Sequence, residues 1–240
     1  MSFLSRSELL IGAEGLVKLK KSHILVIGLG GVGSYAVEAL ARTGVGEITI
    51  VDGDNVVQSN INRQLQALHS TINQSKSYLM AQRLMDINPE LILHEINQFL
   101  KPDDIENILN RPYSFVLDCI DSVTPKLMII KRCKQNKLKF ISSMGAGGKM
   151  NPDLIKIVDI SETKDCYFSR EIRKRLRREH YNYGIKVVYS NEVVAKDKME
   201  LTYDSQYKRS YYGTISYMPA MFGLTMASYV IKKLISHPNS

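Results

Sequence analysis

Short apolar runs alternate with amphipathic segments along the first half of the chain. Each run is rich in Ile, Val and Leu, and most show little alternation of apolar and polar positions, which is typical of strands buried on both faces. We therefore expect five parallel strands, at His23–Gly28, Glu47–Asp52, Leu91–Ile96, Ser114–Asp121 and Phe140–Ser143.

The segments between these runs repeat apolar residues at helical spacing. A helix is predicted over Val32–Arg42, a second ends before the pair Asn88 and Pro89, and a third spans Pro125–Asn136. Strands that alternate with helices predict an α/β fold with a doubly wound, Rossmann-like and mostly parallel sheet.

The pattern changes after Met150. Two further strands are expected at Leu154–Ile160 and Ile185–Ser190, with a strongly basic segment between them. Residues 191–212 are polar and rich in tyrosine, which favours a surface loop.

A last helix is predicted over Pro219–Ile235, with Leu224, Ala227, Ile231 and Leu234 on the face that packs on the sheet. We expect a single ATP-binding domain, divided into a Rossmann-like half over residues 1–150 and a C-terminal α/β extension over residues 151–240.

The amino-acid composition alone excludes few classes of function. The 240 residues are 44% apolar, which is enough for a real core. The formal net charge of +8 and the pI of about 9.3 suit a polyanion such as nucleic acid. Many soluble proteins are equally basic, so the charge alone leaves the partner open.

Cysteine usage and hydropathy favour a cytoplasmic protein. Cys119, Cys133 and Cys166 are odd in number and widely spaced, which argues against a disulfide framework. No CxxC pair is present, so a four-cysteine zinc site is excluded within one chain. We expect neither a signal peptide nor an integral membrane segment, because the longest apolar stretch, Met218–Ile231, is too short to span a bilayer.

The first strand leads into the sequence GLGGVG, which contains Gly28, Gly30, Gly31 and Gly33 and precedes a helix. Such glycines allow a tight turn and close approach of a phosphate to free N–H groups at the helix start. Asp52 ends the second strand, where a carboxylate accepts hydrogen bonds from a ribose. A nucleotide site is predicted, with NAD as the usual ligand; glycines that serve only helix–strand packing are the alternative.

The polar residues that follow Asp52 favour ATP over NAD. Arg63 and Lys76 offer positive charge to a triphosphate, and Asn60 precedes them. Asp121 lies past the fourth strand, where a carboxylate can help to hold Mg²⁺. Each residue alone also has an ordinary interpretation: a solvated loop charge, a helix-surface lysine and a helix cap.

The motifs GLGGVGS, VDGDNVVQSNINRQ and DCIDS, together with Lys76, resemble the adenylating domain shared by ubiquitin-activating enzymes and the bacterial ThiF and MoeB proteins. The resemblance covers nearly the whole chain. It implies an enzyme that transfers AMP from Mg-ATP to a carboxylate and releases pyrophosphate.

The resemblance also implies roles for individual residues. Arg63 and Lys76 would act on the phosphates and Asp121 would hold Mg²⁺, while Arg6 would reach the ATP of a partner subunit in a homodimer. These four residues form the expected catalytic set. The expected nucleotide-binding residues are Gly28, Gly30, Gly31, Gly33, Asp52, Ser59, Asn60, Arg63, Lys76, Asp121 and Ser122.

Within this family the chain is most similar to the tRNA threonylcarbamoyladenosine dehydratases, called TcdA or CsdL. Matching stretches include RSELLIGAEGL, NINRQLQAL, DCIDSVTPK and GAGGKMNP. The resemblance implies an ATP-dependent dehydration beside the tRNA anticodon, in which the threonyl carboxylate is adenylated. The carbamoyl oxygen then attacks the activated carbonyl, AMP leaves and an oxazolone ring closes, so no protein nucleophile is needed.

The alternative acceptor is the C-terminus of a ubiquitin-like sulfur-carrier protein. The absence of paired cysteines makes this alternative less favoured, and only Cys166 lies where an acyl-accepting cysteine could be. An NAD-dependent oxidoreductase ranks below both. A protein partner in sulfur relay is therefore not expected.

The basic segment Arg170–Arg178 is the predicted tRNA contact. Arg170, Arg173, Lys174 and Arg177 can share one helical face, and such clustered charge gives salt-sensitive binding to phosphates. A solvated helix face without a partner is the alternative.

Overall fold

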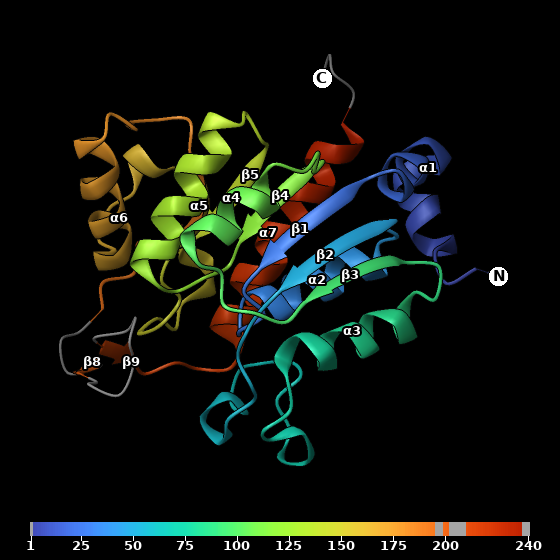
Figure 1. The fold of residues 1–240 in the computed structure, drawn as a ribbon, viewed down its shortest axis with the longest axis horizontal. Coiled ribbons are helices and arrows are strands. Elements are labelled where there is room, and N and C mark those ends of the chain that lie inside the picture. Colours follow the sequence, from blue (N-terminus) through green and yellow to red (C-terminus); the bar gives the residue numbers. More distant parts are fainter. Residues whose placement is uncertain (1, 195–198, 202–209, 237–240) are drawn as a thin grey trace.

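A seven-stranded sheet forms the centre of the molecule, in the order β3-β2-β1-β4-β5-β7-β6 (Figure 1). The computed structural model describes residues 2–194, 199–201 and 210–236. Neighbouring strands run parallel, except that β6 is antiparallel to β7. The strands are β1 (His23–Ile27), β2 (Glu47–Val51), β3 (Ile92–Ile96), β4 (Phe115–Asp118), β5 (Phe140–Ser143), β6 (Ile155–Asp159) and β7 (Lys186–Ser190).

Helices cover both faces of this sheet (Figure 1). Apolar residues of α1, α2, α3 and α7 pack on one face, and those of α4, α5 and α6 pack on the other. The helices are α1 (Ser5–Lys20), α2 (Gly33–Arg42), α3 (Lys76–Ile87), α4 (Pro102–Leu109), α5 (Val123–Gln135), α6 (Tyr167–Arg178) and α7 (Tyr217–Ile235).

The doubly wound α/β fold is thereby confirmed, and the expected strands are present with shifted ends. The fourth strand stops at Asp118 rather than Asp121, because the Asp118 carboxylate accepts a hydrogen bond from the N–H of Ile120 (3.1 Å) and the chain turns there. Helices α1 and α4 lie where no element was predicted.

The polar segment at residues 191–212 is more than a loop. Within its described part, β8 (Met199–Leu201) pairs antiparallel with β9 (Ser210–Tyr212). The pair forms a small sheet of its own, separate from the main one.

The last helix packs as predicted, with one exception on its inward face: Ala227 is buried and Ile231 and Leu234 pack against the core, but Leu224 does not. Met218, Phe222 and Val230 are fully buried, whereas Leu224 is 43% exposed, so its predicted place in the core is wrong. The reason is a close crossing with α2: a Cβ on Gly223 would lie 2.2 Å from the Val32 carbonyl oxygen. The glycine sets which side of α7 meets its neighbour.

The structure also describes the cysteines and the length of the helices. Cys119, Cys133 and Cys166 are free thiols. Among the described residues, no helix has the length and apolar character needed to cross a membrane.

Candidate nucleotide-binding site

The glycine loop joins β1 to α2 at the carboxyl edge of the sheet, and its four glycines differ in what they require. A Cβ on Gly33 would lie 1.8 Å from the Gly28 carbonyl oxygen, and Gly28 itself has a φ of +89°. These two serve the turn and the packing of helix on strand. A Cβ on Gly30 would meet nothing closer than Gln64 Nε2 at 3.7 Å, so packing alone does not explain Gly30.

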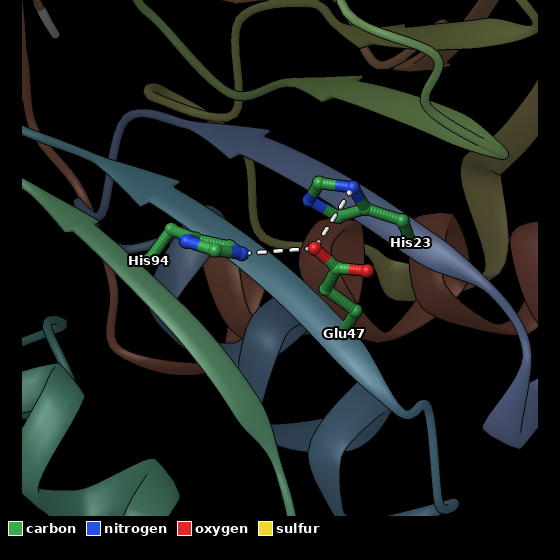
Figure 2. Close-up of side chains that lie close together, drawn as sticks. All are labelled: His23, Glu47 and His94. Atoms are coloured by element: carbon green, nitrogen blue, oxygen red, sulfur yellow. Dashed lines mark hydrogen bonds and ion pairs between the residues drawn. The ribbon is translucent and has the colours of Figure 1, made fainter.

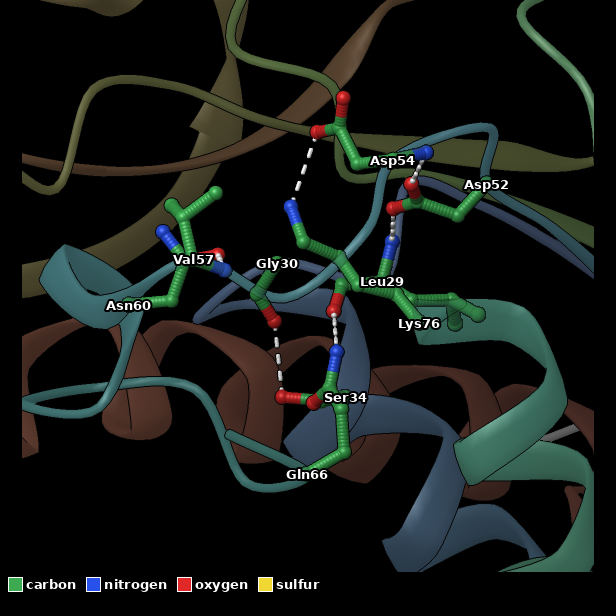
Figure 3. A network of polar contacts seen from close by, with 9 residues as sticks. All are labelled: Leu29, Gly30, Ser34, Asp52, Asp54, Val57, Asn60, Gln66 and Lys76. Carbon is green, nitrogen blue, oxygen red and sulfur yellow. Dashed lines mark hydrogen bonds and ion pairs between the residues drawn. The ribbon is translucent and has the colours of Figure 1, made fainter. Parts of the chain in front are cut away.

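Asp52 fastens this loop to the end of β2 (Figure 3). Its carboxylate accepts hydrogen bonds from the N–H of Leu29 (2.6 Å) and the N–H of Asp54 (2.8 Å). Burial raises the pKa of Asp52, although Lys76 and the two N–H donors oppose that rise. The carboxylate therefore stands beside the glycine loop, as expected for a ribose ligand.

Lys76 is buried, which excludes its interpretation as a helix-surface residue. It begins α3, and its ammonium group donates to the carboxylate of Asp54 at 2.8 Å (Figure 3). Asp54 was not predicted as a site residue, although it lies two residues after Asp52 in the same polar stretch. The ion pair with Asp54 holds the Lys76 ammonium beside the glycine loop and Asp52.

Arg63 is half-buried and held by its neighbours in the chain. Its guanidinium donates to the Ser59 carbonyl and to the Asn62 side chain, both at 2.9 Å. Burial lowers the pKa of Arg63, and the nearby carboxylate of Asp121 acts in the opposite direction. A guanidinium from the polar stretch and a carboxylate from beyond β4 thus converge, and Arg63 is not a freely solvated loop charge. Asn60 is buried, with Oδ1 facing the N–H of Val57 (3.3 Å; Figure 3).

The turn that carries Asp121 rests on a buried ionic network. The ammonium of Lys126 donates to Asp118 (2.7 Å) and to Ser142 (3.1 Å), and the Ser142 hydroxyl donates to Asp118 (2.6 Å). Residue Ser122, not Asp121, occupies the N-cap position of α5, so a capping role does not account for Asp121.

Two further side chains belong to this site and were missed from the sequence. Gln64 and Gln66 are buried next to the glycine loop, and Gln66 donates to the Leu29 carbonyl (2.7 Å). The Oε1 atoms of both amides are buried without a hydrogen-bond partner in the described structure. Buried acceptors of this kind are costly unless a ligand or water satisfies them. The sequence feature that could have identified them is the large number of amide side chains after Asp52.

Arg6 lies far from this loop within its own chain. It is exposed on α1, two residues after Leu4, which packs against Gly44 just before β2. That position is the amino edge of the sheet, whereas the glycine loop lies at the carboxyl edge (Figure 1). The structure does not bring Arg6 together with the other predicted catalytic residues.

The predicted tRNA-contact residues lie on α6 but are not equivalent. Arg170, Lys174 and Arg177 are exposed. Arg173 turns inward, where its guanidinium donates to the carbonyl (2.6 Å) and the hydroxyl of Thr163. Burial lowers the pKa of Arg173, and Arg177 adds to the effect. The face expected to hold four cations therefore presents three.

A groove between α5 and α6 extends this basic surface. Its volume is about 430 Å³. The cations in its lining are Lys131, Lys174, Arg175 and Arg178, of which Lys131 pairs with Glu179 (2.8 Å) and Arg175 with Glu171 (2.6 Å), both also in the lining.

The chain is similar to known proteins over most of its length. Residues 4–240 match the ThiF family. The tRNA threonylcarbamoyladenosine dehydratase of Bacillus subtilis is 39% identical over 96% of this chain and 94% of its own length. The crystal structure of the Escherichia coli tRNA N6-threonylcarbamoyladenosine dehydratase in complex with ATP has a TM-score of 0.88 and 33% identity, and covers 97% of this chain and 93% of its own.

Similarity to the carrier-protein activators is shorter. The molybdopterin-synthase adenylyltransferase of Salmonella typhimurium is 34% identical over 64% of this chain and 60% of its own length. The family match spans almost all of the sequence and includes every element that builds the glycine-loop site, so the chain belongs to the ThiF family.

Proposed function

We propose that this protein is an ATP-dependent tRNA threonylcarbamoyladenosine dehydratase. The observation that carries the proposal is the convergence of the glycine loop, Asp52, Lys76, Arg63 and Asp121 at the carboxyl edge of the sheet. Similarity to dehydratases over nearly the full chain supports the same acceptor.

The residues at this edge fit ATP. A Cβ on Gly30 would meet nothing closer than 3.7 Å, and the buried Oε1 atoms of Gln64 and Gln66 are unsatisfied acceptors that suit N–H or O–H donors of a nucleoside. Lys76 and Arg63 would neutralise the phosphates, because both cations are partly removed from water and so act at low dielectric. Asp121 would supply a carboxylate to Mg²⁺.

The chemistry that follows needs no protein nucleophile. An oxygen of the substrate's threonyl carboxylate bonds to the α-phosphorus of ATP, and the bond to pyrophosphate breaks. The carbamoyl oxygen then bonds to the acyl carbon, AMP departs and the carbamoyl nitrogen loses its proton, so one water is removed overall. Arg63 and Lys76 stabilise charge that develops on the phosphates during the first step.

Cys166 is unsuited to carry the acyl group. It is buried at the start of α6. Burial raises the pKa values of Cys119 and Cys133, which keeps both thiols protonated.

We further propose that the active unit is a homodimer in which Arg6 completes the site of the partner subunit. Its distance from the glycine loop of its own chain supports a role in trans. Each subunit would act as one domain, since strands from residues 1–150 and from residues 151–240 share one sheet.

The tRNA would lie over the exposed cations of α6. Arg170, Lys174 and Arg177 point to solvent, and the groove beside α5 adds Arg178, while its other two cations are paired with glutamates. Such a surface binds phosphates without regard to sequence.

The decisive experiment supplies the protein with threonylcarbamoyl-modified tRNA and Mg-ATP, then digests the tRNA and weighs its nucleosides. We expect a loss of one water from the modified adenosine, with AMP and pyrophosphate formed in equal amounts. Reactions without ATP, and reactions with Lys76→Met, should leave the nucleoside unchanged. Pyrophosphate release that requires a ubiquitin-like carrier protein, with no change in tRNA, would instead establish the alternative acceptor.

A further inference from the structure

Two histidines and a glutamate gather at the amino edge of the sheet, opposite the nucleotide site (Figure 2). His23 opens β1, Glu47 opens β2, and His94 lies within β3. His23 pairs with Glu47 in register, and His94 pairs with Thr49, two residues further along β2. Because alternate residues of a strand share a face, all these side chains project from the same side of the sheet.

The three side chains point at one another. Glu47 Oε1 lies 2.8 Å from His94 Nε2 and 3.3 Å from His23 Nδ1. One ligand atom from each side chain lies within 4.8 Å of the others. In the described part of the chain, no other three His, Cys, Asp or Glu residues come together in this way.

The second nitrogen of His23 contacts the sheet interior. His23 Nε2 lies 2.8 Å from the hydroxyl of Thr49, which is fully buried. With the proton on Nδ1, His23 donates to Glu47 and accepts from Thr49. With the proton on Nε2, Nδ1 turns a lone pair toward the Glu47 carboxylate, and a cation can bind between these two acceptors to an imidazole that Thr49 already orients.

The surroundings of His23 fix the orientation of its ring. The ring of Tyr113 packs edge-on against His23 with 4.7 Å between centroids.

We propose that His23, Glu47 and His94 form a Zn²⁺ site on the amino edge of the sheet, with solvent as the remaining ligand. Two imidazoles and one carboxylate are a ligand set typical of this ion. Tetrahedral bonds of about 2.0–2.1 Å place ligand atoms about 3.3 Å apart. The pair His23 and Glu47 already has that separation, and the side chain of His94 is 42% exposed, which leaves it free to adjust.

The Zn²⁺ site stabilises the folded state and takes no part in the reaction. Its ligands come from three adjacent strands, and β3 is an edge strand that pairs with β2 alone. An ion bound there ties the edge strand to the centre of the sheet. Binding to the folded state alone stabilises that state in proportion to the logarithm of the ion concentration.

The test is a Zn²⁺ titration of the apo protein in competition with a chromogenic chelator, repeated for Glu47→Gln and His94→Ala. Both residues lie at the surface edge, so these variants should fold even if a change at His23 does not. His69→Ala removes an exposed histidine elsewhere and serves as the matched control. Co²⁺ replaces Zn²⁺ in a parallel experiment, where absorption in the visible range reports tetrahedral coordination.

We expect one Zn²⁺ per chain, at least tenfold weaker binding in Glu47→Gln and His94→Ala, and unchanged binding in His69→Ala. Zn²⁺ should raise the melting temperature of the native chain and His69→Ala but not of His94→Ala, and AMP formation should be equal in all variants once EDTA has removed the ion and Mg²⁺ has been restored. Binding that is as strong in His94→Ala as in the native chain, or that is weakened equally by His69→Ala, overturns the proposal and leaves adventitious binding to surface histidines only.

Discussion

At the scale of single residues, the glycine loop separates structural from ligand-binding glycines. A methyl group on Gly33 collides with the Gly28 carbonyl, whereas one on Gly30 makes only an ordinary contact, 3.7 Å from Gln64 Nε2. We predict that Gly33→Ala lowers the free energy of unfolding by about 1–3 kcal/mol or more, as overpacked sites do. Gly30→Ala should leave stability within about 1 kcal/mol but weaken ATP binding, because the added methyl blocks the approach of a phosphate.

Urea denaturation and calorimetric titration with ATP measure the two effects separately. The contrast between the variants is the informative result. If Gly30→Ala bound ATP as tightly as the native chain, the phosphates would not pass over this part of the loop.

Asp159 offers a test of pH dependence. Burial alone would raise the pKa of this carboxyl, but hydrogen bonds from Ser161, Ile185 and Gly184 outweigh it and lower the pKa below its ordinary value. A lowered pKa contributes stability above the unfolded value of about 4 and loses that stability as the pH falls through the folded value.

Asp159→Asn should therefore be less stable than the native chain at pH 7, by about 1–3 kcal/mol. The difference should shrink as the pH falls below about 4 and through the lowered pKa of the folded state, because the native carboxyl then also becomes neutral. Chemical denaturation of both proteins across this range measures it. A difference that stays constant with pH would mean that shape, not charge, stabilises the 159–185 contact.

At the scale of elements, the hydrophobic pattern was sufficient to predict the strands of the sheet. It was not sufficient to predict how the helices pack on the sheet and on one another. Buried parallel strands are continuous apolar runs, so β1, β2 and β5 could be predicted within one or two residues. The exposure of Leu224 on α7 could not, because the orientation of α7 depends on the contact of Gly223 with Val32, beside a helix that comes much earlier in the chain.

The candidate site shows the same division. A sequence motif was enough to predict the loop glycines, Asp52, Arg63, Lys76 and Asp121 as site residues. The ion pair of Lys76 with Asp54 and the buried network beneath Asp121 are tertiary contacts, and a lysine in sequence carries no sign that it will be fully buried.

Helix α6 provides the element-scale prediction. Lys174→Glu combined with Arg177→Glu should weaken tRNA binding and reduce the slope of log affinity against log salt by about 1 for each phosphate that is no longer neutralised. ATP binding should not change, since these side chains lie away from the glycine loop.

Arg173→Ala is the comparison that separates binding from structure. Its guanidinium holds Thr163, so this variant should lose stability while its salt slope stays near that of the native chain. Equal losses of tRNA and ATP binding in the double variant would mean that α6 is structural. Filter binding at several salt concentrations measures the tRNA affinity and the salt slope of the native chain, the double variant and Arg173→Ala.

At the scale of the whole molecule, the distance of Arg6 from its own glycine loop requires a second subunit if this arginine takes part in the reaction. Arg6→Ala and Lys76→Met homodimers should each be nearly inactive, because every site lacks one cation. In a mixed dimer, the Arg6→Ala chain provides an intact Lys76 and receives Arg6 from its partner, so one of the two sites is complete.

Co-expression of the two variants should therefore restore about a quarter of native activity, since about half of randomly assembled dimers are mixed and each has one working site. Differently tagged chains allow the mixed dimers to be purified, and AMP release from modified tRNA measures turnover. If Arg6 acted within its own chain, both sites of the mixed dimer would remain defective, and purified mixed dimers would be as inactive as the parents. Recovery of activity thus requires both that the dimer forms and that an arginine at the amino edge of one sheet reaches the carboxyl edge of another.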